Sequence, residues 1–596
     1  MPIADEILRV DLAAERVTSE EIPEQWLERY VGGKGIGARY LYEKLESGTD
    51  PHSPANILLF VVGPLTGYTP GDQRYAAITK SPLTGTFLDS YAGGTFPALL
   101  AGSLDNQMGV LVTGEADQPV VLSIDGGEAT LEPAPDLWGL DARETCEQFP
   151  DAAVACVGPA GEAGVQYATI ASDGGDHHAG RGGAGTVMGA KKLKAVVVYG
   201  SEPEPERGKL ADLRRRSEEA FADSDVGRWL AASETVETVD FANEVGALPT
   251  HGWQAGRFEG ADEIGIERVR EAATGRERPD DPVPGGFCVD SDEGESVPRG
   301  ATPIVLGAGL GIDDWNAVAT LGTICDRLGM DVITVGNAVA WAVRASQEGL
   351  IHRDLEFGDE EAVRTLIEEI ATRSTPLGDA LAGGVAGAAQ RFGGDDLIPT
   401  VKGMELSSYD PRSAETMALA YATSDRGACH RRARPVELET VSGDHRSVHE
   451  RVRSVVAEQN RRAVLWSLIA DDFLEEVLRP DTVVEWLTAV GYDLEADDLA
   501  LAGERIWTLV RLFNVREGFT REDDELPTTL TEPIEGGPKD GNAIDPDAFD
   551  VLLDRYYAIR DWDQQGRPTA ALLRRLDLAT VPDEETPVSR VSEDTP

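Results

Sequence analysis

Glycine-rich segments that carry a basic residue recur in the first third of the chain, and such segments can hold an anion. Glycine lets backbone N–H groups approach a ligand closely, and a neighbouring arginine or lysine completes the cradle. Basic residues are scarce, because the chain has 54 Lys and Arg against 106 Asp and Glu. Each segment alone is typical of a turn, whereas together they favour a large polyanionic ligand. The segments are VGGKGIGAR (31–39), VGPLTG (62–67), RYAAITKSPLTG (74–85) and SDGGDHHAGRGGAGTVMGAKKLKAV (172–196), with Lys34, Arg74, Arg181 and Lys191 among their basic residues.

The cysteines are isolated from one another in sequence, which argues against a disulfide framework and against a C-x-x-C motif. Cys429 directly precedes His430, and a thiol beside an imidazole suggests a nucleophile pair. Neighbours in sequence seldom face each other, so a structural role for His430 is an equal alternative. The cysteines are Cys146, Cys156, Cys288, Cys325 and Cys429.

Two further patterns resemble known sites and are disfavoured. His177 and His178 are adjacent, and adjacent side chains on an extended segment point to opposite faces, so one metal ion cannot easily use both. The segment 303–318, PIVLGAGLGIDDWNAV, precedes an acid, Asp326, as a dinucleotide-binding motif does. Its spacing is G-x-G-x-G and no βαβ alternation surrounds it, which disfavours a nicotinamide site.

Composition limits the class of protein. A chain of 596 residues is too long for one core and predicts two to four domains. Its formal net charge of −52 excludes a nucleic-acid partner, because phosphate binding needs a basic field. The acid excess extends over the whole length and indicates a salt-adapted cytoplasm, so we expect the fold to loosen on desalting; an acidic bacterial enzyme is the alternative. No apolar run reaches ~18 residues, so no membrane span is expected.

Hydrophobic patterning predicts an α+β fold. Up to residue 203, short Val- and Ile-rich runs end in glycine, as strands do, and predict a β-rich N-terminal domain. After the linker SEPEPERG (201–208), apolar residues recur at three- and four-residue steps, which predicts two largely helical domains. We place these domains at 208–398 and 399–580, and expect the acidic tail, 581–596, to be disordered.

Long motifs spread over the chain resemble those of the aldehyde:ferredoxin oxidoreductase family. They include GGKGIGARYLYEKL, DGGDHHAGRGGAGTVMGAKKLKAV, DRLGMDVITVGN and ELSSYDPRSAETMALAYATSDRGACH. The resemblance implies a β-rich base domain that carries a tungsten or molybdenum ion held by two pterins, with helical domains closing over it. It also implies magnesium between the pterin phosphates and a [4Fe-4S] cluster. Such enzymes oxidise aldehydes to carboxylates and pass electrons to ferredoxin.

The resemblance assigns roles to particular residues. Arg74 and Arg181 match arginines that contact the pterins, and Gly182 and Gly183 match the adjacent backbone cradle. One pterin loop is present as Asp326-Arg-Leu-Gly329-Met-Asp331. Tyr91 replaces an asparagine of the family in a glycine-rich turn whose backbone contacts with the cofactor can persist. His430 matches a histidine near the metal that moves a proton.

The chain also departs from the family pattern. Only Cys288 remains of three cluster cysteines, and in the second pterin loop Trp466 replaces an aspartate and Asp471 a cysteine. One thiolate cannot hold a cubane, because iron–sulfur clusters need several soft thiolate ligands. Ala301 stands where the family has a glutamate near the metal.

Two hypotheses remain open. The first is a bis-pterin oxidoreductase that has lost its cluster and passes electrons to ferredoxin or another acceptor, in the cytoplasm of a halophilic archaeon and with a homodimer as the expected assembly. The second is a non-catalytic descendant that retains the scaffold to bind a cofactor or a partner.

Overall fold

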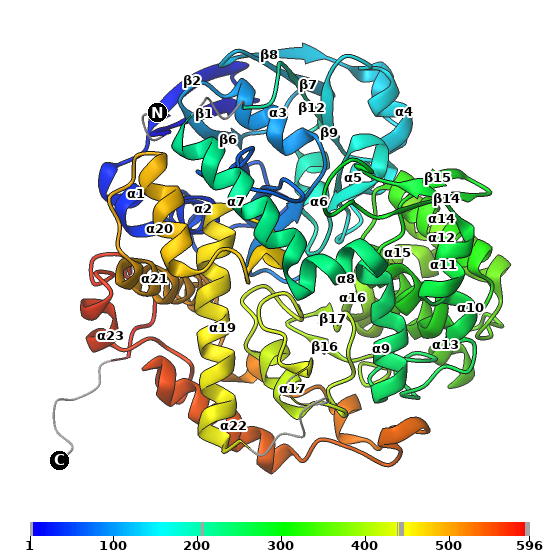
Figure 1. The fold of residues 1–596 in the computed structure, drawn as a ribbon. Helices are drawn as coiled ribbons and strands as arrows, with labels where there is room; N and C mark the ends of the chain where they lie inside the picture. Colours follow the sequence, from blue (N-terminus) through cyan, green and yellow to red (C-terminus); the bar gives the residue numbers. More distant parts are fainter. Residues whose placement is uncertain (1–3, 204–207, 438, 440–445, 590–596) are drawn as a thin grey trace, which may run out of the picture.

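The computed structural model describes residues 4–203, 208–437, 439 and 446–589. In this part of the chain, residues up to 199 contain two six-stranded mixed sheets, and the remainder is mainly helical, which confirms the predicted α+β class (Figure 1). The first sheet has the order β2-β1-β6-β3-β4-β5, and the second β11-β10-β9-β12-β7-β8. The first sheet consists of β1 (Glu6–Asp11), β2 (Arg16–Glu21), β3 (Leu58–Val61), β4 (Tyr75–Lys80), β5 (Phe87–Ala92) and β6 (Gln107–Thr113). The second consists of β7 (Val120–Asp125), β8 (Glu128–Pro133), β9 (Ala153–Cys156), β10 (Ile170–Ser172), β11 (His177–Ala179) and β12 (Leu193–Tyr199).

The two sheets share one core. Strands β3, β4 and β5 are buried at every position, whereas the edge strand β2 is largely exposed and carries polar residues. Such continuous apolar runs require cover on both faces. One face meets the second sheet, because Phe60 and Tyr75 share a buried cluster with Val196. Helices of this part are α1 (Glu24–Tyr30), α2 (Gly33–Lys44), α3 (Phe96–Ser103), α4 (Ala142–Glu147), α5 (Pro159–Glu162) and α6 (Ala184–Ala190).

The middle of the chain is helical apart from a small three-stranded sheet, β13-β14-β15, in the described residues. Its central helix, α13, is buried along most of its length and follows α12 after a short turn. The strands are β13 (Ala273–Arg276), β14 (Phe287–Ser291) and β15 (Gly294–Ser296). The helices are α7 (Lys209–Asp223), α8 (Asp225–Ser233), α9 (Thr238–Val245), α10 (Ala261–Ile264), α11 (Ile266–Ala272), α12 (Trp315–Leu328), α13 (Val332–Gln347), α14 (Glu360–Thr372), α15 (Pro376–Leu381) and α16 (Gly384–Phe392).

Two long helices, α19 and α21, pack together in the last part and cover α2. In Figure 1 these helices lie beside the N-terminal part, so the last part of the chain packs against the first. The elements are β16 (Thr400–Val401), β17 (Met404–Glu405), α17 (Glu415–Ala422), α19 (Val448–Leu468), α20 (Pro480–Ala489), α21 (Ala496–Arg516), α22 (Pro546–Arg560) and α23 (Ala570–Arg575). No helix of the described residues is both long enough and apolar enough to cross a membrane.

The C-terminal tail departs from its prediction over residues 581–589. Tyr42 and Thr586 share a side-chain hydrogen bond, and Arg516 pairs with Asp583 at 3.3 Å. The backbone N–H of Ser589 donates to the carbonyl of Pro568 at 3.1 Å. An acidic composition therefore did not prevent this stretch from packing, because each polar group found a partner; residues 590–596 lie outside the described part.

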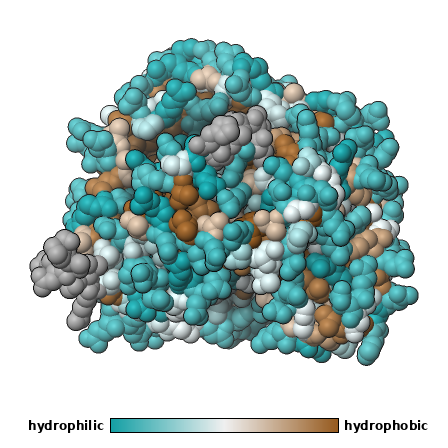
Figure 2. Space-filling view, turned by 90° about the horizontal axis from the view of Figure 1, so that it is seen from below, coloured by the Kyte–Doolittle hydropathy of each residue, from teal (hydrophilic) through white to brown (hydrophobic). Residues whose placement is uncertain are grey.

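The surface carries the excess of acid. Figure 2 shows a face on which hydrophilic residues predominate, with scattered hydrophobic ones. Among the described residues, Leu350 and Val551 are the exposed large apolar side chains. A surface of this kind offers no large apolar patch, in keeping with a net charge of −52.

Candidate functional site

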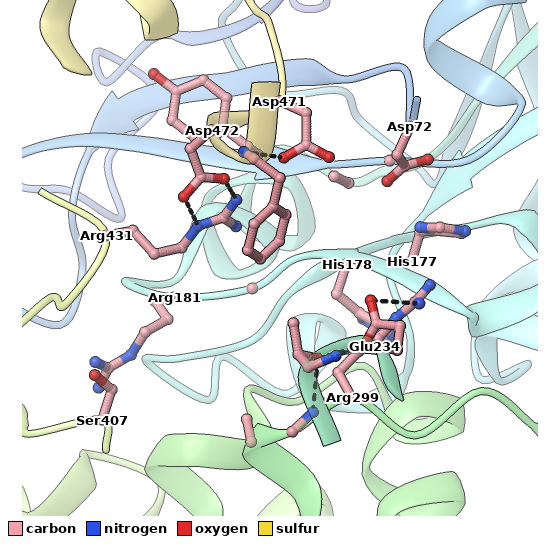
Figure 3. Close-up of a pocket in the computed structure, with 18 of the residues that line it drawn as sticks. Asp72, His177, His178, Arg181, Glu234, Arg299, Ser407, Arg431, Asp471 and Asp472 are labelled. Atoms are coloured by element: carbon pink, nitrogen blue, oxygen red, sulfur yellow. Dashed lines mark hydrogen bonds and ion pairs between the residues drawn. The ribbon is translucent and has the colours of Figure 1, made fainter. Parts of the chain in front are cut away.

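A cavity of about 370 Å³ lies where the N-terminal sheets, the middle helices and the loop after α19 meet (Figure 3). Among the described residues, eight arginines line it beside seven carboxylates, although the chain as a whole is strongly acidic. The predicted residues that line it are Arg74, Tyr91, Arg181, Asp326, Asp331 and His430. Residues more than 350 positions apart are thus brought into one cavity.

His430 lies in the loop after α17 and is partly exposed to the cavity. Its Nδ1 shares a hydrogen bond of 2.7 Å with Oγ of Ser407, which follows β17. Burial, and then the charges of Arg434 and Arg431, hold the pKa of His430 well below its usual range. The imidazole is therefore neutral at physiological pH, and Nε2 is left to exchange a proton with a molecule in the cavity.

Cys429 does not form a pair with His430. Its thiol receives a hydrogen bond of 3.1 Å from Arg426. Burial alone would raise the pKa of Cys429, but Arg426 and Arg432 lower it to about 7. The two neighbours thus contact different partners, as expected for adjacent residues in a turn.

Arg181 and Asp331 form the best-connected part of the cavity wall. Asp331 begins α13 by accepting hydrogen bonds from the backbone N–H groups of Ile333 and Thr334, and it pairs with Nε of Arg181 at 3.3 Å. The remaining nitrogens of Arg181 donate to the carbonyls of Ala428 at 2.6 Å and Glu405 at 2.7 Å. Arg181 is therefore held rigidly by protein atoms.

Asp326 lies near the end of α12 beside His178. Nε2 of His178 donates to the carbonyl of Gly175 at 2.7 Å, and it lies 3.3 Å from Oδ1 of Asp326. Burial lowers the pKa of His178 to about 4, so this ring is neutral. Burial also raises the pKa of Asp326 to about 7, and the charges of Arg299 and Arg143 offset this only in part. The side chain can therefore exist in either protonation state at neutral pH.

The opposite wall contains the substituted positions, and they contact one another. Trp466, at the end of α19, stacks on Tyr91 of β5 with ring centroids 4.1 Å apart. Asp471 pairs with Arg74 at 3.1 Å. Arg431 lies over the Trp466 ring at 5.1 Å and pairs with Asp472, as Figure 3 shows.

Buried donors without partners line this same wall. They are Nε of Arg74, Nε of Arg426, Nη1 of Arg432 and Nε1 of Trp466, and none has a hydrogen-bond partner among the described residues. A buried N–H without a partner costs about 1–3 kcal/mol, so native proteins supply an acceptor. Several such donors around one cavity fit an anionic, oxygen-rich ligand such as a pterin phosphate.

The thiols do not fit an iron–sulfur cluster. Cys288 lies in β14 opposite Gly275, does not line the cavity, and has a thiol pKa raised by burial and nearby acids. Cys146 of α4 interacts with Cys156 of β9, and Cys325 lies buried in α12. No group of three His, Cys, Asp or Glu in the described residues is arranged to hold a metal ion. A cluster that needs four thiolates therefore has no site in this part of the chain.

The glycines predicted for the cofactor cradle allow close packing between segments. A Cβ on Gly182 would lie 2.5 Å from Leu88, and one on Gly183 2.1 Å from the Gln166 carbonyl, so these glycines allow close approach between segments. Gly329 ends α12 with φ of 74°. None of the three glycines lines the cavity, and their contacts with a cofactor stay a prediction.

Lys34 and Lys191 lie outside the cavity. Lys34 is fully buried between Asp89 and Asp425, at 3.0 and 2.5 Å. Lys191 donates to two backbone carbonyls, and burial lowers its pKa to about 8.

Three residues that complete the site were not predicted from the sequence. Ser407 holds His430, and Asp72 and Arg278 extend the ion pairing of Arg74. Ser407 lies in the motif ELSSYD, so its position near His430 was the one available signal. Asp72 and Arg278 are 206 residues apart, and no local pattern predicts their contact.

An α+β scaffold of this topology, with a basic cavity between its sheets and helices, defines a large cofactor-binding oxidoreductase. Over residues 7–200 the chain matches the N-terminal domain of aldehyde ferredoxin oxidoreductase, and over residues 212–578 it matches domains 2 and 3. The chain therefore belongs to the aldehyde ferredoxin oxidoreductase family.

Relatives extend over nearly the whole chain. The tungsten-containing aldehyde ferredoxin oxidoreductase of Pyrococcus horikoshii is 33% identical, covering 96% of this chain and 98% of the relative. The aliphatic sulfonate oxidoreductase, WOR-like subunit, of Pyrococcus furiosus is 26% identical over 96% of both chains. The fold is shared with the active-site complex BamBC of benzoyl coenzyme A reductase, with a TM-score of 0.82, 23% identity and 97% of both chains covered.

Proposed function

We propose that this chain oxidises an aldehyde to a carboxylate with a tungsten or molybdenum bis-pterin cofactor and without an iron–sulfur cluster. The observation that carries the proposal is the set of buried, unpaired donors on Arg74, Arg426, Arg432 and Trp466 around one cavity. The family and the name of the 33%-identical relative support tungsten, a pterin and an aldehyde substrate. Electrons pass to ferredoxin or to another acceptor.

Different residues of the cavity would bind different parts of the cofactor. Arg74, Arg426 and Arg432 would offer N–H donors to phosphate, and the carboxylates of Asp326 and Asp331 would accept hydrogen bonds from N–H groups of the cofactor. The cofactor, when bound, supplies the two-electron oxidation and the oxygen transfer. Magnesium between the phosphates stays a prediction.

His430 handles protons in this proposal. Conversion of an aldehyde and water to a carboxylate releases protons together with the electrons, and a neutral imidazole can accept one. In this proposal Nδ1–H of His430 donates to Oγ of Ser407, which fixes the ring and leaves Nε2 as the nitrogen that takes the proton. Arg181, held by three protein partners, contributes a fixed positive charge nearby.

The test is elemental analysis of protein grown with tungstate and molybdate. We expect tungsten or molybdenum near one per chain with negligible iron, and measurable magnesium if the phosphates share it. In loaded protein, His430→Ala should lower aldehyde turnover about 10²- to 10⁴-fold without loss of metal. Four irons and labile sulfide per chain would refute the cluster-free part of the proposal.

A cofactor- or partner-binding scaffold without catalysis is the second candidate. It is favoured by Ala301, which lines the cavity without a carboxylate, and by the direct contact of Trp466 with Tyr91. Absence of both tungsten and molybdenum after growth with either would support this candidate. A cytoplasmic location, a halophilic source and a homodimer stay predictions of the sequence.

A further inference from the structure

Four charged side chains on the cavity wall form a continuous chain of ion pairs, here called the ion-pair chain. Oδ2 of Asp471 lies 3.1 Å from Nη2 of Arg74, and this same nitrogen lies 3.6 Å from Oδ2 of Asp72. Oδ1 of Asp72 lies 3.2 Å from Nη1 of Arg278. All four residues line the cavity, and Figure 3 shows Asp471 and Asp72 along one side of it.

The ion-pair chain joins three separate parts of the fold. Asp471 follows α19, Asp72 and Arg74 precede β4, and Arg278 follows β13. Its outer links span 397 and 206 residues in sequence. The four side chains therefore act as a cross-link between the last part of the chain, the N-terminal sheets and the middle part.

Burial couples the links among Asp471, Arg74 and Asp72, whereas Arg278 at the end of the chain of ion pairs is 33% exposed. The side chains of Asp471, Arg74 and Asp72 are 9%, 12% and 14% exposed. Removing one partner of a buried pair leaves an uncompensated charge, which destabilises strongly. Burial would raise the pKa of Asp72, but His177, Arg74 and Arg278 together lower it, so the carboxylate stays ionised.

A second set of contacts fastens the same middle segment. Glu277, next to Arg278, pairs with His177 of β11 at 3.0 Å and with Arg299 at 2.6 Å. Its Oε2 also accepts a hydrogen bond of 3.1 Å from the backbone N–H of Gly286. The loop between β13 and β14, which leads to Cys288, is thus held to the sheets by charged side chains.

Asp72 occupies a central position in the ion-pair chain. It separates two arginines, and it also accepts a hydrogen bond of 3.0 Å from the backbone N–H of Gly94. With Asp471 it occupies Nη2 of Arg74 from two sides, while Nε of Arg74 remains buried without a partner at the cavity. The two carboxylates therefore hold the guanidinium of Arg74 in one orientation at the cavity wall.

We propose that the ion-pair chain cross-links these three parts in place of a metal cluster, with Asp72 as the positioning residue that orients Arg74 toward the cavity. The inference rests on the proposed function only in taking the cavity as an anion-binding cofactor site. It follows from the misfit between the thiols and a cluster: Asp471, at a position where the family resemblance implies a thiolate, is bonded to Arg74 instead.

The first experiment measures hydrogen exchange of the full chain prepared without tungstate or molybdate. In Asp72→Asn, which keeps an acceptor for Gly94, amides of residues 277–286 should exchange at least about tenfold faster than in the wild type, and those of α13 should be unchanged. Asp281→Asn is the matched control, because Asp281 is the other carboxylate on Arg278, at 3.2 Å, and is 45% exposed. Equal exchange in both variants would overturn the cross-linking role.

The second experiment measures cofactor retention in protein grown with tungstate. Asp72→Asn makes the cavity more positive, so a purely electrostatic role predicts equal or greater pterin and tungsten content. A positioning role predicts a loss of severalfold, with recovery in Asp72→Glu. Equal or increased content in Asp72→Asn would overturn the positioning role, as would iron and sulfide in the wild type. Absence of all cofactor in the wild type would refute the proposed function while leaving the exchange experiment decisive for the cross-link.

Discussion

The two walls of the cavity are built in different ways. The wall of Arg181, Asp331 and Ser407 is held mainly by hydrogen bonds to backbone groups and to a neutral imidazole, around one ion pair between Arg181 and Asp331. The wall of Arg74 and Asp471 is held by ion pairs and by an aromatic stack. The first wall matches the motifs of the family, whereas the second contains the substituted positions.

The substitutions on the second wall form contacts with one another. Trp466 stacks on Tyr91, and Asp471 pairs with Arg74, so two of the substituted positions face each other and a third faces a retained arginine. If the family's residues had been replaced independently of one another, gaps or unpaired charges would remain, and these are costly in a buried site. The comparison therefore indicates a wall that has been rebuilt around other interactions, and the following predictions test each wall separately.

The largest effect is expected from Asp331→Ala on the first wall. This change removes the cap of α13 and the pairing with Arg181, both buried, and should lower the free energy of unfolding by about 3–5 kcal/mol. Urea denaturation of the cofactor-free protein measures it. The control is Asp314→Ala, which removes the exposed cap of α12 and should cost about 1 kcal/mol. Equal costs would show that Asp331 acts as a helix cap alone.

Much of the first wall could be predicted from the sequence. Arg181, Asp331 and His430 lie in long motifs, and a motif of a dozen residues fixes local structure around each of them. The α+β class followed from a change in hydrophobic period near residue 203, because strands and helices bury their apolar residues at different spacings. The glycines were less informative, since Gly182 permits close packing against Leu88 as readily as ligand contact.

The second wall could not be predicted in the same way. The replacement of a cysteine by Asp471 was visible, but its partner was not, because Arg74 is 397 residues away and their contact depends on how α19 packs. Asp72 and Arg278 do not belong to any motif that predicts their contact. Their pairing exists because three parts of the fold converge, and this is a property of tertiary structure alone.

The next largest effect on stability is expected at Asp326. Burial raises the pKa of this carboxyl to about 7 from an ordinary value near 3.8. The folded state binds this proton more tightly than the unfolded state, so the carboxyl destabilises the fold as pH rises from about 4 through 7. Asp326→Asn should therefore stabilise the cofactor-free protein at pH 8 by about 2 kcal/mol, and the gain should vanish near pH 4. Thermal unfolding at the two pH values checks this, and a pH-independent gain would contradict it.

The smallest effect tests how the first wall positions His430. Ser407→Ala removes the 2.7 Å hydrogen bond to Nδ1, so the imidazole can adopt either tautomer. One hydrogen bond is worth about 1 kcal/mol, and turnover of the loaded enzyme should fall about fivefold to tenfold with KM little changed. Ser407→Thr should restore most of the rate, whereas Ser408→Ala, which alters the neighbouring side chain without touching that bond, should not lower it. A fall in metal content in Ser407→Ala would mean that the serine supports the cofactor and not the orientation of the histidine.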